Sequence, residues 1–341
     1  MAEGLKIAAQ VRQGCRAALS RAITLCESTR PDHVREAALL LQCLREQTPA
    51  SFHSRSLRVG FTGPPGVGKS TLIDRVGTYL TDSLHHKVAV LAIDPSSPDE
   101  RSGGSILGDK TRMQNLSTRA QAFVRPSPSR GALGGVGQAT AEAVALCEAG
   151  GLDVVLVETL GTGQAETHVS HLVDCVVLVL PPAGGDELQG IKKGVLETAH
   201  LVLVNKADGE LFGPAQRALA DVASALSLSP SSRHPSCPRA LAVSAATGAG
   251  VQEAWSVIRR LSKEAHRSGE FDTRRAVQRK MQIWDAVQHS LLHALHSSPL
   301  ARKEESAVEV LVAESTIPTR IAASKIIEAF YKDVSNLPTA L

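Results

Sequence analysis

A glycine-rich stretch between Gly60 and Asp74 reads GFTGPPGVGKSTLID and carries the spacing G-x-x-x-x-G-K-S. A short apolar segment precedes it and a helical pattern follows it. In that setting, backbone N–H groups of residues 66–71 can surround phosphates, the Lys69 ammonium can reach the outer phosphates, and the Ser70 hydroxyl can ligate Mg²⁺. The stretch therefore predicts a nucleoside triphosphate site. Its candidate binding residues are Gly63, Pro64, Pro65, Gly66, Val67, Gly68, Lys69, Ser70 and Thr71.

A second motif, N-K-A-D, predicts which base is bound. The Asp208 carboxylate can accept hydrogen bonds from N1–H and the 2-amino group of guanine, whereas adenine would leave it unpaired. Asn205 can pair with another edge of the base, and Lys206 can pack along it. The later segment VSAATG can bring Ser244 and the N–H of Ala245 to guanine O6. The sequence thus predicts GTP, with candidate base-binding residues Asn205, Lys206, Asp208, Ser244, Ala245 and Ala246.

Acidic residues in two further segments are candidates for the metal site. Glu158 begins E-x-x-G, where most small G proteins have D-x-x-G, and its carboxylate can reach Mg²⁺ directly or through water. The N–H of Gly161 can touch the γ-phosphate. Asp94 ends another predicted strand, and Asp109 in GDKTRM is either a metal neighbour or a helix cap. The candidate metal residues are Ser70, Asp94, Asp109 and Glu158.

Six short apolar segments must position these residues: 57–63, 87–94, 152–159, 175–182, 200–208 and 240–248. Each is followed by a loop and a helical pattern. This alternation predicts an α/β fold, a P-loop NTPase with a mostly parallel sheet flanked by helices. Ligands bind at the carboxyl ends of such strands, where the motifs above lie. Helical periodicity outside this region predicts three parts: an N-terminal helical extension (1–54), a GTPase domain (55–264) and a C-terminal helical extension (265–341).

Composition excludes several classes of protein. Aromatic residues make up 3% of the 341 residues and the net charge is +3, so neither base-stacking platforms nor a basic nucleic-acid footprint is expected. There is no apolar run of about 18 residues, so no membrane span is predicted.

His289, His293 and His296 share one predicted helix face, which is either a metal site or a solvated surface. The absence of carboxylate or Cys partners favours a solvated surface.

The segment PPAGGDELQGIKKG (181–194) has the composition of a conformational switch. It also suits a helix start, because Asp186 and Glu187 would lie in the first turn. Hydrolysis by direct attack of water needs mainly positioning and charge stabilisation. Most G proteins place a catalytic Gln directly after D-x-x-G, whereas this chain has Thr162 there and Gln164 two residues further on. We therefore expect slow intrinsic hydrolysis, with Lys192 or Gln164 completing catalysis when the switch moves.

Seven segments together resemble the MeaB/ArgK family of GTPases, and within it the mitochondrial members. They are GPPGVGKST, IDPSS, GGSILGDKTRM, RPSPSRGALGGV, VETLGTGQAE, PPAGGDELQGIKKG and NKADG. The resemblance covers almost the whole chain. The chain departs mildly from the usual family sequence at Leu160, Thr162 and Ala165. The segment PSSPDERSGG is also about two residues longer than is usual in the family, which affects the expected geometry of the first switch loop.

The resemblance implies a G protein that escorts adenosylcobalamin-dependent methylmalonyl-CoA mutase, gating cofactor loading and protecting the enzyme. It also implies a homodimer formed through the C-terminal extension, and hydrolysis that is slow until the mutase rearranges the switch loops. By motif match, Asp186, Gln189 and Lys192 form the partner-responsive switch. Adenosylcobalamin is expected on partners, because a D-x-H-x-x-G signature is absent. A cobalamin adenosyltransferase is a further candidate partner.

Two alternatives stay open. A nickel-insertion GTPase shares E-x-x-G and the fold, but would need a His- or Cys-rich N-terminus, and this chain offers there only isolated histidines such as His33 and scattered cysteines. A binding scaffold with a purely structural nucleotide is disfavoured by Lys69, Ser70 and Glu158. The expected compartment is a mitochondrial matrix or a bacterial-type cytoplasm. No transit peptide is evident, although the amphipathic, Arg-bearing start could be either a mitochondrial address or an ordinary first helix.

Overall fold

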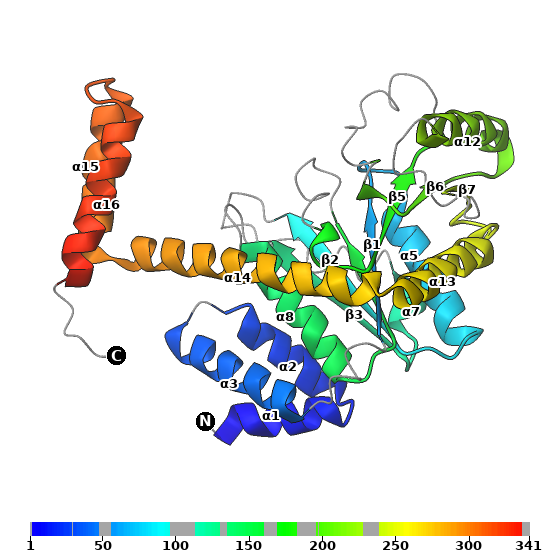
Figure 1. Cartoon of the computed structure of the whole chain (residues 1–341), viewed down its shortest axis with the longest axis horizontal. Helices are drawn as coiled ribbons and strands as arrows, with labels where there is room; N and C mark the ends of the chain where they lie inside the picture. Colours follow the sequence, from blue (N-terminus) through cyan, green and yellow to red (C-terminus); the bar gives the residue numbers. More distant parts are fainter. Residues whose placement is uncertain are drawn as a thin grey trace. The chain divides into compact units, whose positions relative to one another are not determined.

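The computed structural model describes residues 2–28, 30–47, 56–95, 113–129, 135–159, 169–182, 196, 198–227 and 239–335. The chain divides into two compact units, residues 1–282 and 283–341, and the division falls within one helix, α14. Figure 1 traces the elements of both units.

The first unit contains a seven-stranded sheet with the order β3-β2-β4-β1-β5-β6-β7, in which every neighbouring pair is parallel. The strands are β1 (Leu57–Thr62), β2 (Val88–Pro95), β3 (Ala122–Ser129), β4 (Val154–Glu158), β5 (Cys175–Leu180), β6 (Leu201–Val204) and β7 (Ala240–Ala242). The predicted parallel α/β sheet is therefore confirmed: five strands fall within the predicted apolar segments, and β2 ends one residue beyond its segment.

The seventh strand, β3, was not anticipated from the sequence. Its residues include Pro126 and Pro128, which lack the N–H group that a central strand must donate. In the structure β3 is the terminal strand of the order and pairs with β2. An edge strand tolerates proline because one of its sides forms no hydrogen bonds with a neighbouring strand. For this reason the two prolines led the sequence analysis to overlook β3.

Helices cover both faces of the sheet. They are α1 (Ala2–Arg12), α2 (Arg16–Cys26), α3 (Pro31–Gln47), α5 (Lys69–Asp82), α7 (Gln114–Ser117), α8 (Gly135–Ala149), α12 (Phe212–Ser227) and α13 (Val251–Ser268), with a 3₁₀ turn η1 at Gly209–Leu211. On one face α5 and α13 share a core with β1 that includes Leu72, Trp255 and Phe61. Burial of these apolar side chains is the main force holding the layers together.

The N-terminal helices α1–α3 are integrated into the opposite face (Figure 1). Ile7 of α1 and Ile23 of α2 belong to the same buried cluster as Leu146 of α8 and Val155 of β4. Helices α1 and α2 contact each other, and α2 packs on α8. The N-terminal helices therefore add an outer layer to the nucleotide domain.

The second unit contains the C-terminal part of α14 (Glu270–Ser297), α15 (Pro299–Ala313) and α16 (Thr319–Ser335). Helix α15 begins after Ser298, whose side chain accepts a hydrogen bond from the N–H of Ala301 at 3.2 Å, and Pro299 occupies the first helical position. Such a cap satisfies one of the free N–H groups of a helix start. Helices α15 and α16 pack against each other. No helix in the described ranges is long and apolar enough to cross a membrane.

Candidate nucleotide-binding site

The loop between β1 and α5 adopts the backbone of a phosphate cradle. Gly63, Gly66 and Gly68 have φ values of +145°, +77° and +88°, a region that favours glycine. At Gly63 a Cβ atom would lie 2.0 Å from the carbonyl oxygen of Val179, so no larger residue fits. The Lys69 ammonium donates to the carbonyl oxygens of Gly63 at 2.8 Å and Pro64 at 2.9 Å. The loop thus wraps around the Lys69 ammonium group at the amino end of α5.

Ser70 and Glu158 meet beside this loop. Ser70 lies in the first turn of α5, and Glu158 is the last residue of β4, paired in register with Phe61 of the neighbouring strand β1. The Ser70 hydroxyl donates to Oε1 of Glu158 at 2.6 Å. A hydroxyl and a carboxylate held together at a phosphate loop are oxygen donors of the kind Mg²⁺ prefers. These two side chains fit the ligand set expected from the sequence.

Asn205 joins three loops at the carboxyl edge of the sheet. Its Nδ2 donates to the carbonyl oxygen of Val67 at 2.8 Å, and its Oδ1 accepts from the N–H of Ala245 at 3.1 Å. The residue is 1% exposed. The sequence suggested contact with the base for Asn205 and for the Ala245 N–H, and in this structure both groups engage each other. Asn205 therefore ties the phosphate loop, the N-K-A-D loop and the S-A-A loop together.

The other base-loop residues are also brought together. Lys206 has φ +60° and its ammonium donates to the carbonyl oxygen of Gly66 at 2.9 Å. The Ser244 hydroxyl donates to Oδ2 of Asp208. The structure thus places Lys206 across the phosphate loop and fixes the Asp208 carboxylate, with Ser244 fully buried as its support.

Sequence reasoning missed Arg75 as part of this site. Arg75 lies on α5, and its guanidinium donates to the carbonyl oxygens of Ala245 at 3.2 Å and Ala246 at 2.5 Å. It anchors the S-A-A loop to the helix that begins with Lys69. An arginine inside an ordinary helical pattern gave no signal, because its partners lie 170 and 171 residues away in the chain.

Several candidate residues lie wholly or partly outside the described part of the chain. Asp94 lies at the carboxyl end of β2, but its side chain is outside the described part. Asp109, Gly161, Gln164, Asp186, Gln189 and Lys192 lie outside the described residues altogether. Their roles stay predictions. Within the described ranges, no group of three or more His, Cys, Asp or Glu residues is arranged to hold a metal ion; the side chain of His289 is not among the described ones.

Comparisons with known proteins add family context to this geometry. The family model described as "Methylmalonyl Co-A mutase-associated GTPase MeaB" matches residues 19–299. A probable GTPase of Mycobacterium tuberculosis is 47% identical over 323 residues, covering 94% of each chain. The mitochondrial methylmalonic aciduria type A homolog of Mus musculus is 43% identical, covering 93% of this chain and 77% of that protein. The crystal structure of an LAO/AO transport system kinase matches with a TM-score of 0.71 at 31% identity, covering 96% of this chain and 97% of that one.

Proposed function

This chain belongs to the MeaB family of methylmalonyl Co-A mutase-associated GTPases, and we propose that it is a G-protein chaperone of methylmalonyl-CoA mutase. It is a GTPase, as its relatives are named. In the proposed cycle, GTP binding and hydrolysis gate the loading of adenosylcobalamin into the mutase and protect the loaded enzyme. The cofactor is carried by partners, and a cobalamin adenosyltransferase is a candidate donor.

The contact between Ser70 and Glu158 at 2.6 Å carries the catalytic part of the proposal. It holds two oxygen donors beside the phosphate loop, where Mg²⁺ would neutralise charge on the phosphates when bound. The Lys69 ammonium, already inside the loop, can stabilise the negative charge that develops on the transferred phosphoryl group. The fixed Asp208 carboxylate supports selection of guanine over adenine. These residues supply binding and charge stabilisation, and do not by themselves explain activation.

We infer that activation comes from the segment containing Asp186, Gln189 and Lys192, with Gln164 as the alternative catalytic group. Docking of the mutase would bring one of these side chains to the γ-phosphate. The carboxylates of Asp94 and Asp109 would complete the surroundings of Mg²⁺. This assignment follows from the family motifs.

We also propose a homodimer formed through the C-terminal extension from residue 265. The described part of this extension exposes large apolar side chains that an isolated soluble subunit would bury. On α14, Ile283 is 61% exposed, Trp284 73% and Leu291 59%, and on α16 Tyr331 is 64% exposed. The proposed compartment is the mitochondrial matrix or a bacterial-type cytoplasm, where this protein would bind methylmalonyl-CoA mutase.

The test is GTP turnover by the purified protein, alone and with methylmalonyl-CoA mutase added. A Lys192→Ala variant is compared with Lys263→Ala, which removes an exposed lysine of α13. We expect strong stimulation by the mutase that Lys192→Ala loses and Lys263→Ala keeps. Tight GTP binding without stimulation would contradict the mutase proposal, and the nickel-insertion and scaffold alternatives would then have to be tested.

A further inference from the structure

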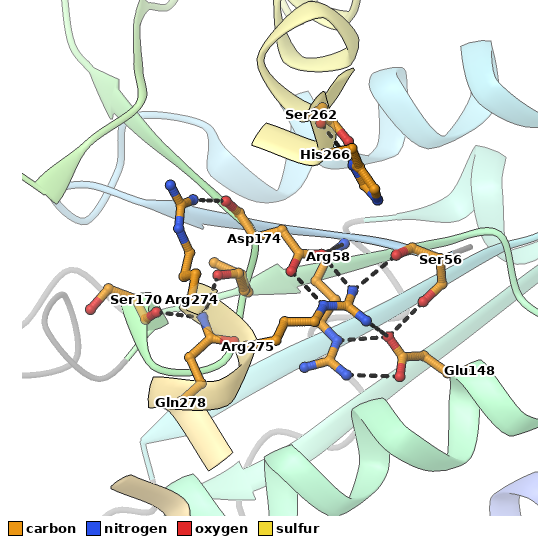
Figure 2. A network of polar contacts seen from close by, with 11 residues as sticks. Ser56, Arg58, Glu148, Ser170, Asp174, Ser262, His266, Arg274, Arg275 and Gln278 are labelled. Carbon is orange, nitrogen blue, oxygen red and sulfur yellow. Dashed lines mark hydrogen bonds and ion pairs between the residues drawn. The ribbon is translucent and has the colours of Figure 1, made fainter. Parts of the chain in front are cut away.

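The first turns of α14 hold the backbone that leads into β5 (Figure 2). The side-chain amide of Gln278 donates to the carbonyl oxygens of Ser170 at 2.9 Å and Val173 at 2.7 Å. One turn later, Gln282 donates to the carbonyl oxygen of His171 at 3.2 Å. Gln278 is 3% exposed. Helix α14 thus donates side-chain hydrogen bonds to three carbonyl groups of the segment that leads into β5.

The segment 169–174 rests directly on the strand that carries the phosphate loop. A Cβ atom at Gly60 of β1 would lie 2.5 Å from a methyl group of Val169 and 3.0 Å from one of Val173. Val169 and Val173 are each 1% exposed. Gly60 is three residues before Gly63, where the phosphate cradle begins. Because this packing is so close, a shift of β1 near the loop must move the segment, and the reverse also holds.

A buried ion-pair network fixes α14 to the opposite end of β1. Arg275 pairs with both carboxylate oxygens of Asp174, at 2.8 and 2.7 Å, and donates to the carbonyl oxygen of Ser56 at 2.9 Å. Arg58 of β1 pairs with Glu148 at 2.7 Å. Helix α14 is therefore anchored at the start of β1, and through Val169 and Val173 of segment 169–174 it is also linked to Gly60, nearer the phosphate loop.

We propose that Gln278 is a positioning residue that couples the nucleotide state of the phosphate loop to helix α14. The path runs from Gly63 along β1 to Gly60, through Val169 and Val173, to the carbonyl groups that Gln278 holds. The division between the two units falls within α14, after Gln282, so the same helix continues into the C-terminal unit. Coupling of this kind is reciprocal: whatever engages the C-terminal part of α14 would alter affinity for GTP relative to GDP. The inference rests on the GTPase activity alone and requires no mutase.

The test compares Gln278→Met with Gln288→Met. Methionine keeps the length of glutamine and removes its donor; Gln288 is exposed on the same helix. Affinity for GDP is measured first, because its loss would point to a defect in nucleotide binding or folding. Hydrogen–deuterium exchange of α14 is then recorded with GDP and with guanosine 5′-(β,γ-imido)triphosphate. Steady-state GTP turnover follows.

We expect exchange in α14 to differ between the two nucleotides in the wild-type protein and in Gln288→Met. Gln278→Met should lose that difference, and its kcat should fall at least about fivefold while KM stays within about twofold. A purely structural role of Gln278 would lower thermal stability without lowering kcat relative to KM. If Gln278→Met fails to fold, Gln282→Met, which removes one longer hydrogen bond, should lose part of the difference. Equal exchange with both nucleotides in the wild type, or an undiminished difference and kcat in the glutamine variants, would overturn the proposal.

Discussion

Replacing Arg275 by methionine should destabilise the first unit by about 3–5 kcal/mol. The side chains of Arg275, Asp174 and Glu148 are 5%, 5% and 1% exposed. Two arginines, Arg275 and Arg58, face two carboxylates in this network, so its charges balance. The substitution removes the two-oxygen pair with Asp174, the bond to Ser56 and the 3.4 Å contact with Glu148. Methionine fills most of the volume, so the cost comes from one uncompensated buried carboxylate.

The free energy of unfolding is measured by urea titration with tryptophan fluorescence, in which Trp255, 3% exposed in the core of this unit, reports unfolding, whereas Trp284 is already 73% exposed in the folded protein. Arg279→Met on the exposed side of the same helix is the control and should change stability by less than about 0.5 kcal/mol. The double variant Arg275→Met/Asp174→Asn should recover part of the loss, because it removes the unpaired charge. A loss below about 1 kcal/mol, or no recovery in the double variant, would refute the reasoning.

Three further outcomes follow from the structure. Gly63→Ala should abolish GTP binding in a titration with a fluorescent analogue, because the new Cβ would lie 2.0 Å from the carbonyl oxygen of Val179; retained affinity would contradict the cradle. Asp208→Asn should weaken GTP binding by about a hundredfold or more while improving that of xanthosine triphosphate, since two hydrogen bonds to a charged acceptor are lost; equal losses for both nucleotides would argue against base contact. Burial, and then the charge of Arg274, lower the pKa of His200 to about 4. The unfolded chain therefore binds more protons than the folded one as pH falls from about 6.5 to 4, and stability should fall by up to about 1.4 kcal/mol per pH unit in that window and stay constant above it. Urea titrations should show that His200→Gln removes this slope, and an unchanged slope would assign it to other groups.

The sequence predicted the parallel sheet because each buried strand is an apolar run followed by a loop and a helix. It also placed a nucleotide motif at the carboxyl end of the sheet, since β1 and the first turn of α5 are joined by only six residues. The strand β3 was not predicted because Pro126 and Pro128 are typical of loops. These prolines are compatible with strand pairing only because β3 lies at the edge of the sheet.

What the sequence determined by itself is the chemistry that lies close together in the chain. Glycines at 63, 66 and 68 fix the loop, Lys69 and Ser70 follow directly, and N-K-A-D carries a base-reading carboxylate. What only the tertiary structure decided is how these pieces are joined. Asn205 bonds to Val67 across 138 residues, and Arg275 reaches Asp174 and Ser56 across 101 and 219 residues. Polar partners so distant in sequence leave no periodic or spacing signal, because their meeting depends on the packing of β1, segment 169–174 and α14, which the hydrophobic core sets.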